Sequence, residues 1–142
     1  MAENGGAYFP VRAGFCRDRA ARALRRAHGW EGVGRYVGLL CMLLEEPGNA
    51  LDVSETDGMD DLAEQLGLDR DGCAGLLADM ASAGLVDAQS LADGTVRAPV
   101  VDEAIEKWDS IIEAKRAAGR ASGEARRRKA LERSSNDAAN SD

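Results

Sequence analysis

The side chains that could do chemistry in this sequence are cations, and most of them fall into two clusters. The first cluster contains Arg17, Arg19, Arg22, Arg25 and Arg26, the second contains Arg126, Arg127, Arg128 and Lys129, and Arg97 stands alone between them. Clustered Lys and Arg side chains bind nucleic acid by releasing counterions from its phosphates, without sequence specificity. We therefore predict a largely electrostatic contact with DNA. The alternatives are a solvated helix face or internal ion pairs for the first cluster, and a solubilising tail or a linker for the second.

The charges are segregated along the chain, although the net charge is −7. Residues 12–35 hold seven arginines against two acids, and residues 113–133 hold eight cations against three acids. Residues 45–110, between them, hold seventeen acids against three cations. The basic segments can therefore attract either an anionic partner or the acidic segment of the same chain, and the net charge does not decide between the two.

Catalytic and metal-binding patterns are missing from the sequence. His28 is the single histidine, and its place before Gly29 predicts a contact with the free carbonyl groups of a helix end. The segment D-V-S-E-T-D-G, which starts at Asp52, lacks the glycine position and the final Glu of a calcium-binding loop. There is no phosphate loop ending in Gly-Lys-Ser/Thr and no cysteine cluster. We predict a protein that is not an enzyme and has no metal site, cofactor or small-molecule substrate.

These cations must be positioned by a mainly α fold with a small β-hairpin, because the chain is rich in Ala, Leu and Arg and only 4% aromatic. Apolar spacing and stop signals predict helices at residues 17–28, from Gly29 to 45, at 59–66, from an Asp69 cap to 83, and from 101 onward. A short strand is predicted at 50–53. A hairpin is predicted to pair 85–86 with 95–100 around a turn at Asp93-Gly94.

The glycine-rich second helix is predicted to be the central core helix. Gly34 and Gly38 lie one turn apart, which predicts close approach by a neighbouring backbone. Cys41 and Cys73 are expected to face the core as reduced thiols, which favours a cytoplasmic protein. The N-terminus lacks the pattern of a secretory signal, and the longest apolar run, residues 37–44, is too short to span a bilayer.

The order of the elements matches a winged helix-turn-helix domain followed by a long C-terminal helix. We predict a flexible N-terminus at 1–7, the winged-helix domain at 8–100, an amphipathic helix at 101–118 and a basic, disordered tail at 119–142. The outward residues of the helix in the recognition position are Arg70, Asp71, Ala74, Ala78, Asp79 and Ser82. Because this surface is acidic, we do not expect it to face phosphates or to read the major groove.

The last predicted helix has an apolar stripe formed by Val101, Ile105, Trp108 and Ile112. Such a stripe usually packs on its own domain. Its spacing also fits a contact between two copies through Ile105, Trp108 and Ile112, so self-association is a second hypothesis.

Four segments of the sequence carry a family resemblance. They are Y-F-P from Tyr8, R-D-R-A-A-R-A-L-R-R-A-H-G-W-E-G-V-G-R-Y-V-G-L-L-C-M-L-L-E-E-P from Arg17, D-L-A-E-Q-L-G-L-D from Asp61, and L-L-A-D-M-A-S-A-G-L-V from Leu76. Together they resemble the N-terminal winged-helix domain of phage replisome-organiser proteins. These are relatives of DnaD-like primosome components. The resemblance covers about residues 8–100 and implies a DNA-replication role with DNA binding and self-association, but without catalysis. The alternatives are a winged helix that binds only other proteins, and a small transcriptional regulator.

Overall fold

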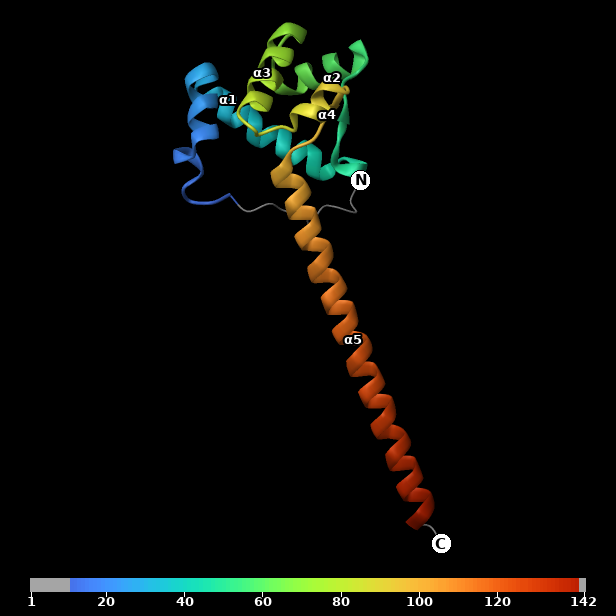
Figure 1. Cartoon of the computed structure of the whole chain (residues 1–142). Helices are drawn as coiled ribbons and strands as arrows, with labels where there is room; N and C mark the ends of the chain where they lie inside the picture. The colour runs from blue at the N-terminus through green and yellow to red at the C-terminus, as the bar shows by residue number, and fades with distance from the viewer. Residues whose placement is uncertain (1–10, 141–142) are drawn as a thin grey trace. The chain divides into compact units, whose positions relative to one another are not determined.

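The computed structural model describes the backbone of residues 11–140 and the side chains of residues 11–136. The structure is mainly helical, with one two-stranded antiparallel sheet and a long C-terminal helix, which confirms the predicted fold class (Figure 1). The predicted flexible N-terminus at 1–7 lies outside the described residues. Contacts divide the chain into two compact units, Met1–Ile105 and Glu106–Asp142.

The elements follow one another in a fixed order along the chain. They are η2 (Phe15–Arg17), α1 (Arg19–Glu45), η3 (Pro47–Asn49), β1 (Leu51–Asp52), α2 (Thr56–Leu66), α3 (Arg70–Ser82), α4 (Ala88–Ala92), β2 (Thr95–Val96) and α5 (Pro99–Asn140). Within the first unit, α3 packs against α1, α2 and α4. Its inward side chains Leu76, Leu77 and Met80 are almost fully buried there.

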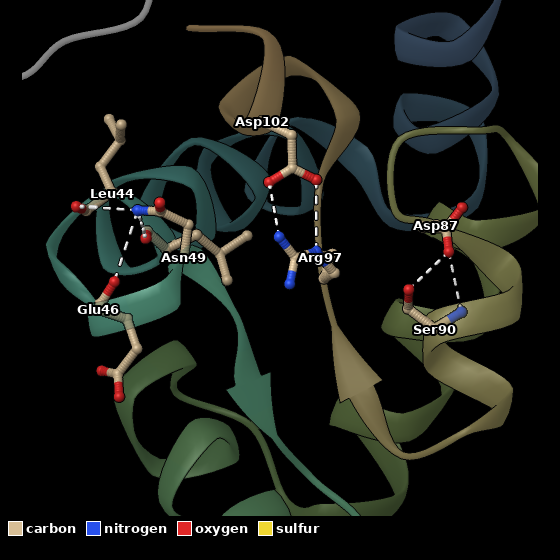
Figure 2. A network of polar contacts seen from close by, with 8 residues as sticks. Leu44, Glu46, Asn49, Asp87, Ser90, Arg97 and Asp102 are labelled. Atoms are coloured by element: carbon tan, nitrogen blue, oxygen red, sulfur yellow. Dashed lines mark hydrogen bonds and ion pairs between the residues drawn. The ribbon is translucent and has the colours of Figure 1, made fainter. Parts of the chain in front are cut away.

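Helix α1 contains both of the first two predicted helices, and Gly29 separates them. Gly29 has φ +71° and ψ −171°, a conformation outside the helical region. The predicted interruption at Gly29 is therefore confirmed. The second half of α1 ends before Pro47, as predicted. The side-chain amide of Asn49 donates to the carbonyl oxygen of Leu43 at 3.0 Å and to that of Leu44 at 3.4 Å. Figure 2 shows the contact with Leu44.

The turn between α2 and α3 also follows the local sequence signals. Gly67 ends α2 in the left-handed conformation, with φ +72°. Asp69 then caps α3, because its Oδ1 accepts a hydrogen bond from the backbone N–H of Gly72 at 2.7 Å. Both features were expected from the sequence.

The predicted strand pairing is wrong. β2 pairs with β1, more than forty residues earlier in the chain, with Leu51 opposite Val96 and Asp52 opposite Thr95. The residues expected to continue a strand after 85–86 form α4 instead. Asp87 caps that helix, because its carboxylate accepts hydrogen bonds from both the backbone N–H and the hydroxyl of Ser90 (Figure 2).

Close backbone approach occurs at glycines other than the predicted ones. A Cβ atom added at Gly34 or Gly38 would meet nothing within 4 Å, so the prediction for this pair is wrong. The close approach is at Gly58, where a Cβ would collide with the backbone oxygen of Asp52.

The core prediction for the cysteines is half right: Cys73 is buried, whereas Cys41 is exposed. Val37, one turn before Cys41 on the same side of α1, is exposed as well, so this side of the helix lies outside the core of the described residues.

Helix α5 continues through Asn140, so residues 119–140 are helical where a disordered tail was predicted. This segment is rich in Ala, Arg, Glu and Lys, which are good helix formers, and their preference outweighs about 1 kcal/mol of cost at each of Gly119 and Gly123. At its start α5 contributes Val101 and Ala104 to the core of the first unit. Among the described residues, none of the helices combines the length and the apolar character needed to cross a membrane.

Candidate nucleic-acid interface

Four arginines from the start of α1 and from η2 surround one shallow concavity. Arg19, Arg22 and Arg26 lie on one face of α1 at a spacing of three and four residues, and Arg17 joins them from η2. The concavity has a volume of about 400 Å³ and is lined by these four side chains, all of them exposed. We call these four residues the arginine cluster. Ala21 and Leu24, on the opposite face of α1, are buried, which fixes the direction in which the cluster points.

The arginine cluster has no carboxylate partner among the side chains of residues 11–136. The acid nearest in sequence, Asp18, is held by Arg12 at 2.7 Å. Other arginines of the first unit do have partners: Arg35 lies 3.6 Å from Glu31, and Arg70 lies 2.8 Å from Asp60. Internal ion pairing, one of the alternatives for this segment, is therefore not what the described side chains of the cluster do. Within the described part of the chain, these four charges are not neutralised by an acid.

Arg25, the fifth predicted member, makes a different contact. Its guanidinium carbon lies 5.0 Å from the centroid of the Trp30 ring, within the range of a cation–π interaction. Trp30 itself is 61% exposed. Trp30 belongs to the helix that was predicted to be the central core helix, and for this residue that prediction is wrong.

His28 contacts a side chain and not the carbonyl groups of a helix end. Its Nε2 lies 2.6 Å from Oδ2 of Asp79, which joins the first half of α1 to α3. Asp79 is one of the six outward residues predicted for α3, and all six are exposed as expected. The expectation for His28 failed because a carboxylate on a packed neighbouring helix is a stronger partner than a frayed helix end.

Helix α3, which the sequence analysis predicted to occupy the recognition position of a winged helix, has one arginine, and that arginine is paired. Its single arginine, Arg70, donates two hydrogen bonds to the carboxylate of Asp60, at 2.8 and 2.9 Å. This contact lowers the pKa of Asp60 and raises the pKa of Arg70, so both groups stay charged and paired. The acidic character predicted for this surface is confirmed.

Arg97 is occupied by an acid of its own unit. Its guanidinium donates to both carboxylate oxygens of Asp102, at 3.3 and 3.4 Å, between the end of β2 and the first turn of α5 (Figure 2). A phosphate would have to compete with this carboxylate. Arg97 therefore stands apart from the arginine cluster, with its charge largely compensated.

The second predicted cluster lies in the second unit. Arg126, Arg127, Arg128 and Lys129 are consecutive residues of α5, and all four are exposed. Consecutive residues of an α-helix point in different directions, so these charges surround the helix and do not form one stripe. None of them pairs with an acid among the side chains that the structure describes; the described ion pair of this unit joins Arg120 to Glu113 at 3.1 Å.

The residues of the predicted self-association stripe are divided between the units. Ile105 packs against the core of the first unit, whereas Trp108 and Ile112 belong to the second unit and are partly buried. The dimer contact stays a prediction.

An apolar groove of about 260 Å³ is also present in the first unit. Phe15, Tyr36 and Leu40 line it, and the rings of Phe15 and Tyr36 stack with their centroids 5.9 Å apart. Burial raises the pKa of Tyr36 to about 12, so its hydroxyl stays protonated.

Over the residues described, no group of three or more His, Cys, Asp or Glu side chains could hold a metal ion.

Comparison with known proteins gives one family. No curated protein and no solved structure matches the chain. The family model described as Lin1244/Lin1753-like, N-terminal, matches residues 8–96. This region includes the arginine cluster and Trp30 but ends before Arg97 and the second basic cluster. Because the match covers more than half of its length, the chain belongs to the Lin1244/Lin1753-like, N-terminal family.

Proposed function

We propose that this protein is a non-catalytic DNA-binding and assembly protein of phage or prophage DNA replication. It binds the phosphate backbone of DNA through the arginine cluster. The single observation that carries the DNA-binding proposal is the set of four exposed arginines around one concavity, which have no carboxylate partner among the side chains of residues 11–136. The replication role is supported by the sequence resemblance to replisome-organiser proteins.

The charge distribution also suggests how the protein would approach DNA. Phosphate contacts position a protein on DNA, whereas base readout needs side chains that reach the groove edges. Helix α3 exposes Asp71 and Asp79, and its one arginine is paired with Asp60. We therefore expect the duplex to lie against the start of α1, with little dependence on base sequence. Arg126, Arg127, Arg128 and Lys129 would supply a second phosphate contact from α5.

A salt-titrated binding assay with a duplex of random sequence tests this proposal. Each phosphate contact contributes a slope of about −0.9 to the dependence of log K on log salt concentration. Arg22→Gln is expected to weaken binding and to flatten the slope by about one unit. The matched control is Arg70→Gln, which removes the same charge from an exposed but paired arginine and should leave the slope unchanged. Truncation after Ile112 should flatten the slope further, because it removes the second cluster.

Three outcomes would contradict the proposal in different ways. If the full-length protein does not retain duplex at low salt, the DNA-binding proposal fails and the protein-interaction alternative replaces it. Equal effects of Arg22→Gln and Arg70→Gln would remove the arginine cluster from the interface. Strong preference for one duplex sequence would favour the transcriptional regulator.

A further inference from the structure

Trp30 is held in a defined position on the protein surface. The guanidinium of Arg25 lies over its ring at 5.0 Å, and the residue is nevertheless 61% exposed. The guanidinium can cover only one face of the ring, so the remaining surface is open to a ligand. The cation–π contact favours this orientation of the ring, which lowers the entropic cost of a stacking contact.

The backbone turns directly before Trp30. Gly29 has φ +71° and ψ −171°, a conformation that is accessible almost only to glycine, and it separates the two halves of α1. Trp30 is the first residue after this break, and the buried Val33 lies three residues further along the chain. The ring of Trp30 therefore lies where the chain changes direction, in contact with Arg25 from the half of α1 before the break.

The arginine cluster lies next to this ring in the chain. Arg26, which lines the concavity, follows Arg25 directly and precedes Trp30 by four residues. Phosphate-binding cations beside an exposed, fixed aromatic ring are the two parts of a site for single-stranded nucleic acid, in which bases stack on aromatic side chains and cations follow the backbone. In a duplex the bases are already stacked on one another, so the ring has no partner there.

We propose that Trp30 and Arg25 form a base-stacking site that adjoins the arginine cluster and gives this protein a preference for single-stranded DNA. The phosphate part of this site rests on the proposed function, whereas the stacking part rests on Trp30 and Arg25 alone. A base stacks on the open face of the indole ring while the arginine cluster holds the neighbouring phosphates. Arg25 positions the ring from its other face.

The test uses the full-length protein and three oligonucleotides of equal length: oligo-dT, the same strand with abasic sites throughout, and a duplex. The abasic strand keeps the phosphates and removes the bases. Trp30→Ala is expected to weaken binding to oligo-dT by at least about fivefold, the lower end for loss of one stacked base. Its affinity for the abasic strand and for the duplex should change less than twofold, and Trp30→Phe should restore most of the affinity for oligo-dT.

A second readout does not depend on affinity. In a Trp108→Phe background, Trp30 is the single tryptophan, since the chain has two. Oligo-dT should quench its fluorescence at saturation, and the abasic strand should not. The far-UV circular dichroism and thermal unfolding of each variant establish that it is folded.

The outcomes separate the two proposals. Equal weakening of all three ligands by Trp30→Ala, or no weakening at all, would overturn the stacking site, as would fluorescence that oligo-dT leaves unchanged. In that case an effect of Arg22→Gln on the duplex and the abasic strand would leave the phosphate contact standing. If Arg22→Gln changes the affinity for neither the duplex nor the abasic strand while Trp30→Ala weakens binding to oligo-dT alone, the stacking site stands and the proposed phosphate contact of the arginine cluster is wrong.

Discussion

The same substitution, Gly→Ala, is expected to have opposite effects at two positions of α1. Gly29 has φ +71° and ψ −171°, so an alanine there must adopt a conformation that costs about 1–3 kcal/mol. Nothing lies within 4 Å of a Cβ at Gly29, so this cost comes from the backbone and not from a collision. Gly38 is helical and its Cβ position is also empty, so alanine should stabilise α1 by about 1 kcal/mol. The two variants should therefore differ by roughly 2–4 kcal/mol in free energy of unfolding.

Urea unfolding followed by far-UV circular dichroism measures this difference. Gly34→Ala is the matched second control, because it too is helical with an empty Cβ position. Thermal unfolding should show the same order, with about 4 °C in Tm for each kcal/mol. The reasoning is refuted if Gly29→Ala is as stable as Gly38→Ala, because the interruption of α1 would then not depend on a conformation reserved for glycine.

Three other predictions follow from burial and exposure. Cys16 and Cys41 are exposed, whereas Cys73 is buried, and burial raises the pKa of its thiol. A thiol reagent should therefore label Cys16 and Cys41 in the native protein and Cys73 only on unfolding, and rapid labelling of all three would contradict the fold. The pKa of Tyr36 is raised from 10.0 to about 12, so its contribution to stability is complete below pH 10 and declines as the pH rises to 12, by about 3 kcal/mol in total. In Tyr36→Phe, the free energy of unfolding measured with urea should lose about 3 kcal/mol less than in wild type between pH 10 and pH 12. The same pH dependence in both proteins would contradict the raised pKa of Tyr36. If the α5 stripe mediates self-association, light scattering should give wild type a mass above that of a monomer and Trp108→Ala a lower one; a monomeric wild type ends the hypothesis.

The features that the sequence predicts well are those set by neighbouring residues. Gly29 and Gly67 interrupt or end helices because glycine alone adopts their conformations at little cost. Asp69 caps α3 through a hydrogen bond that spans three residues. Each of these signals lies within one helical turn of the structure that it decides, so no knowledge of the remaining fold is needed.

Strand pairing was mispredicted because it depends on residues far apart in the chain. The segment at 95–96 pairs with Leu51 and Asp52, more than forty residues earlier in the chain, and no local sequence signal indicates this partner. The sequence nevertheless contained a signal for a helix in place of the predicted strand. Asp87 precedes Ser90 by three residues, and this side chain can cap a helix as readily as it can precede a strand turn.

The candidate interface was found in outline but not in detail. The first group of arginines is evident from the sequence, yet which cations are neutralised depends on acids brought in by the fold. Arg97 is paired with Asp102, five residues away, and Arg70 with Asp60, ten residues away. The guanidinium of Arg25 contacts the ring of Trp30, whereas the sequence had assigned Arg25 to the phosphate-binding cluster. Composition therefore predicts a basic segment, whereas only the contacts separate its available charges from its compensated ones.

Trp30 lies at the surface although it belongs to the helix that was predicted to be the central core helix. It directly follows Gly29, where the two halves of α1 meet, and it is 61% exposed. Gly32 is needed at the same turn, because a Cβ at that position would collide with the Cβ of His28. The glycines on either side of Trp30 thus act together: one allows the turn, and the other allows the two halves of α1 to approach each other. These glycines therefore shape the turn between the two halves of α1, whereas the sequence prediction had assigned the glycines of this helix to close packing with a neighbouring backbone.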